Sequence, residues 1–348
     1  MTHFQHVLQE WYQENKRDLP WRRTKDPYKI WLSEVILQQT RVDQGMDYYL
    51  KFIDRYPCIT DLAGAKEQEV LSLWQGLGYY SRARNAHSTA KFVENELNGK
   101  FPSSYDELIK LKGIGPYTAS AIASFSFGEA QAVLDGNVYR VISRIYNIHI
   151  PINSTEGVRE FTQAAKKLLN KKDPASHNQA IMEFGALVCL PKTPKCNICP
   201  FDLECISRKQ GKVKELPVKI RKTKNKQRYF LYTVFVNFEE NILFLRKRTE
   251  KDIWRNLYDF HLQEFSSAED LEEKITPQTS EFNIIQRKHL LTHQTINACF
   301  IIVKASSLKK APKGMLPVDL NELSRYPLPV LIKNYIDKNL VQLYSLIS

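Results

Sequence analysis

The sequence predicts a two-domain protein, in which an all-helical first domain is followed by a smaller α+β domain. Apolar residues recur at helical spacing from residue 1 to about residue 205. Segment 208–228 then carries ten Lys or Arg residues against one acidic residue, which marks a linker. Beyond it, short runs of aromatic and β-branched residues favour strands. We therefore place the first domain at 1–207, the basic linker at 208–228 and the second domain at 229–348.

The net charge of the chain indicates what kind of partner it binds. A net charge of +12 points to a polyanionic partner, and nucleic acid fits better than a membrane because no basic amphipathic helix or lipidation signal accompanies it. No apolar run approaches membrane-spanning length. The first residues predict an amphipathic helix with Phe4, Leu8 and Trp11 or Tyr12 on one face, rather than a signal peptide. We expect an intracellular monomer in the cytoplasm, associated with the nucleoid if the source is bacterial.

In the first domain, Gly and Pro residues separate the helices, most clearly in LKGIGPYTAS at 111–120. This stretch predicts a helix that stops, turns sharply and restarts at Pro116. Backbone N–H groups at such a turn, together with the start of a helix, form a concavity suited to a phosphate. Such a contact holds the backbone of a nucleic acid and carries no base specificity. A turn with a purely structural role fits the same pattern.

Two carboxylates of the first domain lie in apolar surroundings. If 30–42 is a helix, Ile30 and Leu37 are neighbours of Glu34, and burial there would raise its pKa and favour a protonated acid. Alternatively, Glu34 borders the core and pairs with an arginine. Asp135 ends an apolar run just before a glycine, where a helix N-cap is the simplest role. The pair indicates acid–base chemistry on a glycosidic bond only if the fold brings them together.

A cluster of cysteines closes the first domain. Four of the six cysteines fall within 17 residues in the pattern C-x6-C-x2-C-x5-C, namely Cys189, Cys196, Cys199 and Cys205. Structural zinc sites usually draw ligands from two separated pairs, whereas four thiolates in one compact run favour a 4Fe-4S cluster; zinc stays the alternative. Cys58 and Cys299 stand alone, and we expect both to be small core residues.

The second domain combines strands with helices. YFLYTVFV at 229–236 and ILFLRKR at 242–248 predict a β-hairpin across a polar turn, and NACFIIVK at 297–304 predicts a further strand. Segments 270–275 and 329–339 have helical patterns. The domain is therefore expected to be a mixed α+β unit.

Taken in order, these elements resemble the helix-hairpin-helix DNA glycosylase superfamily with an iron–sulfur loop, and within it the adenine DNA glycosylase (MutY) family. The resemblance covers nearly all of the first domain and extends more weakly into the second. It is carried by the four cysteines and by LPWR (19–22), SEVILQQTRV (33–42), GLGYYSRARN (76–85), LKGIGPYTA (111–119), LDGNVYR (134–140) and NQAIMEFGALVC (178–189).

The resemblance implies a helix-hairpin-helix at 108–123, with a possible monovalent cation, an iron–sulfur loop at 189–205 and a Nudix-like second domain. The segment 242–260 lacks the acidic box of Nudix hydrolases, so nucleotide hydrolysis is not expected there. KHLLTHQTI at 288–296 matches the family's loop that inspects 8-oxoguanine, with Leu291 in place of an aromatic residue and Thr292 in place of a serine. An ordinary polar turn is the alternative interpretation of this loop.

Site residues follow from the same resemblance. Glu34 would be the general acid at adenine N7 and would afterwards help to activate water. Asp135 would stabilise the positively charged sugar, either electrostatically or as a transient covalent partner. The remaining residues fall into three groups: Tyr117 and Asn137, which orient these carboxylates; Trp21, Arg22, Leu37 and Gln179, which line an adenine pocket; and Gln39, Thr40, Tyr79, Gly113, Gly115, Thr292 and His293, which contact DNA.

The implied reaction is removal of adenine opposite 8-oxoguanine or guanine in double-stranded DNA. In the similar endonuclease III family, a lysine at the position of Tyr117 attacks the sugar and then cleaves the strand as a Schiff-base lyase. A tyrosine forms no imine, so a monofunctional glycosylase that leaves an abasic site is expected. The alternatives are an endonuclease III-like glycosylase/lyase of different base choice, and a catalytically silent iron–sulfur DNA-binding protein.

Overall fold

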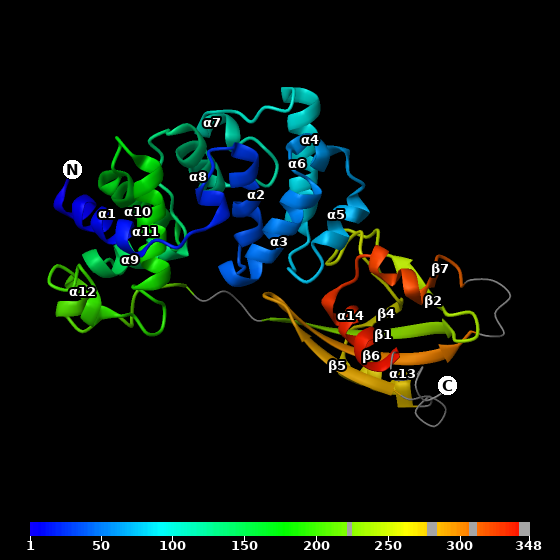
Figure 1. The fold of residues 1–348 in the computed structure, drawn as a ribbon. Helices are drawn as coiled ribbons and strands as arrows, with labels where there is room; N and C mark the ends of the chain where they lie inside the picture. The colour runs from blue at the N-terminus through cyan, green and yellow to red at the C-terminus, as the bar shows by residue number, and fades with distance from the viewer. Residues whose placement is uncertain (221–224, 277–283, 306–311, 341–348) are drawn as a thin grey trace. The chain divides into compact units, whose positions relative to one another are not determined.

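The computed structural model describes residues 1–220, 225–276, 284–305 and 312–340 of the chain. It divides into two compact units, each described by itself below (Figure 1). The first, helical unit combines Met1–Gly64 with Asn85–Arg221. The second, mixed unit combines Ala65–Arg84 with the chain from Lys222 onward. The predicted boundaries at 207 and 229 stay predictions.

The first unit is built of helices, as the apolar spacing predicts. Its elements are α1 (His3–Asn15), η1 (Pro20–Arg22), α2 (Pro27–Leu37), α3 (Val42–Arg55), α4 (Ile59–Gly64), most of α6 (Ser81–Leu97), α7 (Tyr105–Leu108), α8 (Pro116–Phe127), α9 (Gly136–Tyr146), α10 (Thr155–Leu168), α11 (Pro174–Leu187), η2 (Cys196–Ile198) and α12 (Ile206–Lys209). Helix α8 packs against α2 and α11, and α11 also packs against α1 and α9.

Side-chain caps set where the site-bearing helices begin. Asp26 caps α2 by accepting the Tyr28 N–H at 2.9 Å, and a proline occupies the first helical position. Asp173 caps α11 in the same way, again ahead of a proline. Asp135 caps α9 and accepts the Val138 N–H at 2.7 Å. The predicted capping role of Asp135 is therefore confirmed.

Helix α2 differs from the segment 30–42 that the apolar spacing predicts. It starts three residues earlier, because Asp26 and Pro27 form a strong start signal, and it ends at Leu37. The Thr40 N–H donates to the Leu37 carbonyl at 3.1 Å, and Gln39 has a left-handed backbone with φ of 56°. The chain then restarts as α3. Glu34 lies on α2 either way, but Gln39 and Thr40 lie in a turn.

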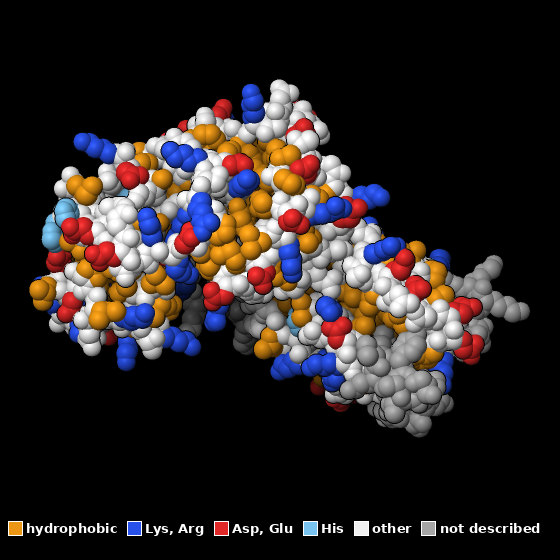
Figure 2. Space-filling view, viewed as in Figure 1, with side chains coloured by type: hydrophobic (Ala, Val, Ile, Leu, Met, Phe, Trp, Pro, Cys, Tyr) orange, Lys and Arg blue, Asp and Glu red, His pale blue; other side chains and the backbone are white. Residues whose placement is uncertain are grey.

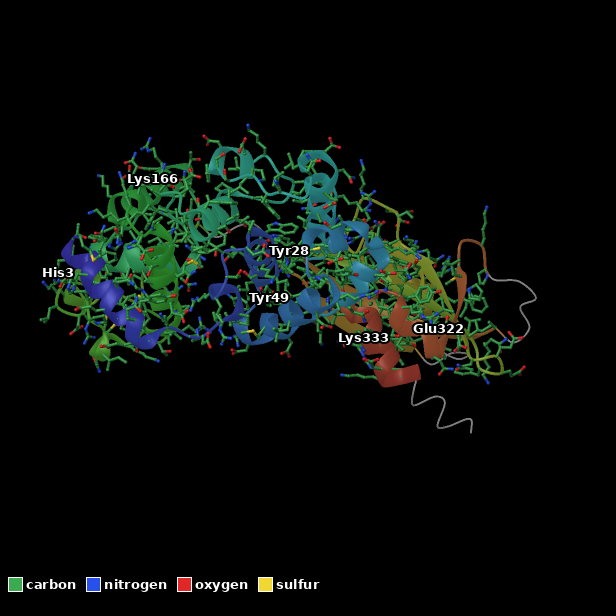
Figure 3. The ribbon with its side chains drawn as sticks, turned by 45° about the horizontal axis from the view of Figure 1, so that its top comes forward. His3, Tyr28, Tyr49, Lys166, Glu322 and Lys333 are labelled. Carbon is green, nitrogen blue, oxygen red and sulfur yellow. The ribbon has the colours of Figure 1, made fainter. Side chains whose placement is uncertain are left out.

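The core of the helical unit confirms the amphipathic N-terminal helix. Leu8 and Tyr12 of α1 are buried, with exposed fractions of 0% and 4%. Tyr28 of α2 is buried as well, and its hydroxyl donates to the Tyr56 carbonyl at 2.7 Å (Figure 3). Cys58 contradicts the expectation of a core residue: it is exposed, and its thiol contacts Asp61 Oδ2 at 2.9 Å.

The second unit contains a seven-stranded sheet, which confirms the predicted α+β character. Its strands are β1 (Lys226–Asn237), β2 (Ile242–Lys247), β3 (Tyr258–Asp259), β4 (His261–Phe265), β5 (Ile284–Leu290), β6 (Gln294–Lys304) and β7 (Leu316–Asp319). The order β3-β2-β1-β6-β5 forms the main path, with β4 paired to β1 and β7 to β2. The predicted hairpin is β1–β2 and the predicted third strand is β6, which pairs with β1 in parallel. The patterns at 242–248 and 297–304 therefore identified genuine strands.

Helices cover both faces of this sheet (Figure 1). Leu271 of α13 (Ala268–Ile275) packs on Cys299, which confirms that Cys299 is a core residue. Tyr335 of α14 (Val330–Tyr335) stacks on Phe300 with ring centroids 4.0 Å apart. Successive strand residues point to opposite faces, so the two helices lie on opposite sides. A π-helical turn, Ile336–Leu340, follows α14, and α5 (Glu67–Leu73) packs on η4 (Leu320–Arg325).

The surface carries many cationic side chains. On the face seen in Figure 2, Lys and Arg side chains are spread over the visible surface among acidic ones, so the net charge of +12 is not confined to one patch of this face. Among the residues that the structure describes, none of the helices is both long and apolar enough to cross a membrane.

Candidate active site

A cavity of about 180 Å³ in the helical unit collects most of the predicted site residues. All four residues predicted for chemistry and all four predicted for the adenine pocket line it. They are Glu34, Tyr117, Asp135, Asn137, Trp21, Arg22, Leu37 and Gln179. They come from η1, α2, α8, α9 and α11 and from the residue that caps α9, so the cavity unites segments that are distant in the sequence.

Glu34 is a buried carboxyl group that lines this cavity. Only 6% of Glu34 is exposed, and the Tyr117 hydroxyl donates to Glu34 Oε2 at 2.6 Å. Burial raises the pKa of Glu34 to about 7; the Tyr117 hydrogen bond opposes the rise and the negative charge of Asp135 adds to it. No ion pair to Glu34 occurs in the described ranges, so pairing with an arginine does not account for its burial. Glu34 is therefore poised to hold a proton near neutral pH.

Asp135 lies at the start of α9, within a chain of hydrogen bonds. It accepts the Val138 N–H and the Asn137 Nδ2–H, each at 2.7 Å. Burial raises the pKa of the Asp135 carboxyl, and these two donors oppose that rise. Arg140 Nη2 donates to Asn137 Oδ1 at 2.8 Å, while its Nε donates to the Cys189 carbonyl at 2.6 Å. Arg140 thus connects the cap of α9 with the cysteine-rich loop.

One wall of the cavity contains an ion-pair network that sequence reasoning missed. Glu183 is 1% exposed and accepts from Arg17 at 2.7 Å and Arg22 at 2.8 Å. Burial alone would raise the pKa of Glu183, but the two guanidinium groups outweigh it and hold the pKa at about 2. Glu183 therefore stays ionised and fixes Arg22 beside the cavity. A carboxylate within the apolar run of 178–189, like Glu34 in its own run, is the signal that could have found it.

The sharp turn before α8 forms as predicted, with the helix restarting at Pro116. Gly113 has φ of 77°, and a Cβ there would lie 2.7 Å from the Asn85 side chain, so both the backbone angle and the space require glycine. Gly115 is the N-cap residue and no side chain caps the helix. Within the described part of the chain, no side chain therefore caps the first backbone N–H groups of α8.

The four clustered cysteines surround a second, smaller cavity of about 20 Å³. Arg144, 1% exposed, ties this loop together: its guanidinium lies 3.4 Å from Cys189 Sγ and donates to the carbonyls of Leu190 and Pro191 at 2.7 and 2.9 Å. Within the described ranges, no three His, Cys, Asp or Glu side chains are grouped closely enough to hold a single metal ion. The four thiols thus share one space without converging on one point.

The other predicted DNA-contacting residues lie outside the large cavity, apart from Thr40, which lines it. Gln39 and Tyr79 are both exposed and both have left-handed backbones, with φ of 56° and 46°. In the second unit, Thr292 and His293 are exposed at the turn between β5 and β6. The Tyr79 and Thr292 hydroxyl groups are in hydrogen-bond contact.

Two family models match the chain. The model described as HhH-GPD superfamily base excision DNA repair protein matches residues 32–171, and the NUDIX domain model matches residues 232–338. The first range contains Glu34, Asp135 and the glycine turn, and the second contains most of the sheet. Both agree with the two kinds of domain that the sequence predicts.

Two relatives that match different shares of the chain have the same name. The adenine DNA glycosylase of Buchnera aphidicola subsp. Baizongia pistaciae is 36% identical over 97% of this chain and 97% of its own length. Human adenine DNA glycosylase is 41% identical over 62% of this chain and 41% of its own length.

Solved structures agree on the fold. A thermostable thymine-DNA glycosylase is similar with a TM-score of 0.56 and 28% identity, covering 60% of this chain and 95% of its own. A non-covalent endonuclease III–DNA complex matches with a TM-score of 0.52 and 22% identity, covering 61% of this chain and 99% of its own, and supports the fold alone. The chain is therefore a DNA glycosylase of the helix-hairpin-helix superfamily and belongs to the adenine DNA glycosylase family.

Proposed function

We propose that the protein removes adenine mispaired with 8-oxoguanine or guanine in double-stranded DNA, by hydrolysing the N-glycosidic bond. The single observation that carries the proposal is the pairing of Glu34 and Tyr117 beside Asp135 in one cavity. A flipped-out nucleotide has to reach such a cavity, because the bond is inaccessible within a stacked duplex. A mispaired base costs least to extrude.

Glu34 acts as the general acid. Adenine leaves readily only after its ring is protonated, and a carboxyl whose pKa is about 7 keeps a proton available near neutral pH. After departure of the base, the resulting carboxylate accepts a proton from water as it attacks the sugar. The Tyr117 hydroxyl, 2.6 Å from Glu34 Oε2, orients the carboxyl group in both protonation states.

Asp135 supports the positive charge that develops on the sugar. Its hydrogen bonds from Val138 and Asn137 favour the ionised form against the cost of burial. A fixed carboxylate in a cavity sheltered from water stabilises an oxocarbenium-like transition state more than it would in bulk water. Asn137, held in turn by Arg140, positions that carboxylate.

The reaction stops at the abasic site. A phenol at position 117 cannot form the imine that a lyase requires, and the hydroxyl is already engaged with Glu34. Tyr117→Lys is therefore expected to gain an adduct that borohydride traps. Absence of any adduct in a folded variant that still releases adenine would contradict this placement of residue 117 beside the sugar.

The four cysteines fit a 4Fe-4S cluster. Thiols that share a cavity without converging on one point suit a centre with several iron atoms better than one tetrahedral ion, which needs its four ligands about 2.3 Å away. Cys189, Cys196, Cys199 and Cys205 would hold it, and it would brace the loop that Arg144 and Arg140 bind. Its role in this proposal is structural.

DNA contacts extend beyond the cavity. We assign phosphate binding to the N–H groups after Gly113 and Gly115, with a monovalent cation at the turn as an associated ligand. Gln39 and Tyr79 are assigned to the displaced base stack, since exposed side chains on left-handed residues project from turns. Thr292 and His293, exposed at the β5–β6 turn, are assigned to 8-oxoguanine.

A comparison of duplexes tests both parts of the proposal. Adenine is placed opposite 8-oxoguanine, guanine or thymine, and base release is followed under single-turnover conditions. The wild type should prefer 8-oxoguanine, and changing Thr292 and His293 together to Ala should reduce that preference by about 1–3 kcal/mol without abolishing release. An unchanged preference would place recognition of the opposite base in the helical unit.

A further inference from the structure

Gln179 reaches the cavity from α11, and its amide group can adopt two orientations that differ by exchange of its oxygen and nitrogen. One orientation presents N–H donors to a base where the other presents a carbonyl acceptor. In the structure, Gln179 Oε1 faces the neighbouring α1 and accepts from the Tyr12 hydroxyl at 2.8 Å. Tyr12 is outside the set of residues that line the cavity, so it acts on the base only through the amide.

The Tyr12 hydroxyl carries a proton that needs a hydrogen-bond acceptor. Its residue is 4% exposed, and burial raises the pKa of the phenol; the positive charge of Arg22 opposes the rise and Glu183 adds to it. The phenol therefore keeps its proton at neutral pH. The Arg22 guanidinium lies 5.8 Å from the centre of the Tyr12 ring and is itself bound to Glu183 at 2.8 Å. In the described ranges, this hydroxyl makes no other hydrogen bond.

A fixed amide distinguishes purines by the group at carbon 6. Adenine has an amino group there, flanked by the ring acceptors N1 and N7, so a glutamine can accept from the amino group and donate to a ring nitrogen. A 6-oxopurine such as hypoxanthine has an oxygen instead, which faces the amide oxygen unless the amide turns over. Oε1 keeps a second lone pair for the amino group while it accepts from Tyr12.

We propose that Tyr12 is a specificity-determining positioning residue, which locks the Gln179 amide in the orientation that accepts adenine and disfavours 6-oxopurines. This inference rests on the proposed removal of adenine. Turning the amide over would let its N–H2 group donate to the Tyr12 oxygen instead, but it would leave without an acceptor the Tyr12 O–H group, which makes no other hydrogen bond in the described ranges. The hydroxyl thus makes the unwanted orientation costly at a site that the base never touches.

The test compares adenine with hypoxanthine opposite the same partner base, in single-turnover release by the wild type and by Tyr12→Phe. The phenylalanine variant should lower the preference for adenine about tenfold, because the amide can then turn over for hypoxanthine. Tyr28→Phe is the matched control, since Tyr28 is also buried and donates to a carbonyl, at 2.7 Å, on another part of the helical unit (Figure 3). Its preference should equal that of the wild type.

A double-variant cycle identifies the route of the effect. In Gln179→Leu, which has no amide, the further change of Tyr12 to Phe should leave the preference unaltered. The inference is overturned if Tyr12→Phe keeps the wild-type preference, if Tyr28→Phe loses it equally, or if the Tyr12 effect persists without Gln179. Binding constants for duplexes with uncleavable 2′-fluoro nucleotides of the two bases give the same ratio without chemistry. If the wild type released neither base, the proposed function would fail while the binding ratio still decided the role of Tyr12.

Discussion

Replacing Tyr117 by phenylalanine removes the hydroxyl that donates to Glu34 Oε2 at 2.6 Å and leaves the ring in place. This hydrogen bond favours the ionised carboxylate and so lowers the pKa of Glu34. With the bond in place, burial still raises that pKa to about 7. A hydrogen bond to a charged group contributes about 1.5–3 kcal/mol, equivalent to roughly 1–2 pKa units. Glu34 is only 6% exposed, so solvent screening weakens this contribution little. The pKa of Glu34 should therefore rise by that amount in the variant.

The assay is the pH dependence of single-turnover adenine release. Release requires protonated Glu34, so the rate should fall as pH rises through the pKa of this group. In Tyr117→Phe the midpoint of that fall should move upward by roughly 1–2 pH units, even if the maximal rate drops because the carboxyl group is less well oriented. A midpoint that stays in place or moves downward would refute the assignment of Glu34 as the titrating acid held by Tyr117.

Three further substitutions test other parts of the account. Glu34→Gln should abolish base release. It should also raise the free energy of unfolding by roughly 3 kcal/mol at about pH 8, because a carboxyl group with a pKa raised from 4.5 to about 7 destabilises the fold once it is ionised. Urea titrations should show that this gain in stability vanishes as the pH falls to about 4.5. Cys199→Ser should lose iron and DNA binding, whereas the exposed Cys58→Ser should keep both, as measured by iron content and gel shift. Gly185→Ala should slow adenine release far more than Gly64→Ala. A Cβ at Gly185 would lie 2.6 Å from Asn137, which lines the cavity, whereas a Cβ at Gly64 would meet nothing within 4 Å. Equal single-turnover rates for the two variants would contradict the close packing of α11 on α9.

Most of the fold could be predicted from the sequence, because the signals for helix starts and strands are local. The capping residue Asp135, the restart at Pro116 and the apolar run of β6 each depend on neighbours within a few positions. The end of α2 was missed because nothing in QQT resembles a helix stop, and the left-handed Gln39 is imposed by the turn into α3. Strands β4, β5 and β7 were missed because their exposed or short patterns lack clear alternation.

The residues that line the cavity were predicted through the resemblance to a family, whereas the contacts among them required the structure. Spacing along one helix suggested a buried Glu34, but the proximity of Tyr117 depends on how α8 packs against α2. The roles of Arg140 and Glu183 were missed, because a single sequence does not show that their partners lie far along the chain. Cys58 was misplaced for the opposite reason: a cysteine is usually buried, but this one precedes a short surface helix.

The most direct test of the central claim uses one duplex with adenine opposite 8-oxoguanine, incubated with wild-type protein and with Glu34→Gln at equal occupancy. Strands are separated with and without alkali. The account predicts strand breaks at the adenine position only after alkali with the wild type, and none with Glu34→Gln despite nearly unchanged duplex affinity. Breaks without alkali would show a lyase, and equal release by Glu34→Gln would show that this buried carboxyl group is not the acid.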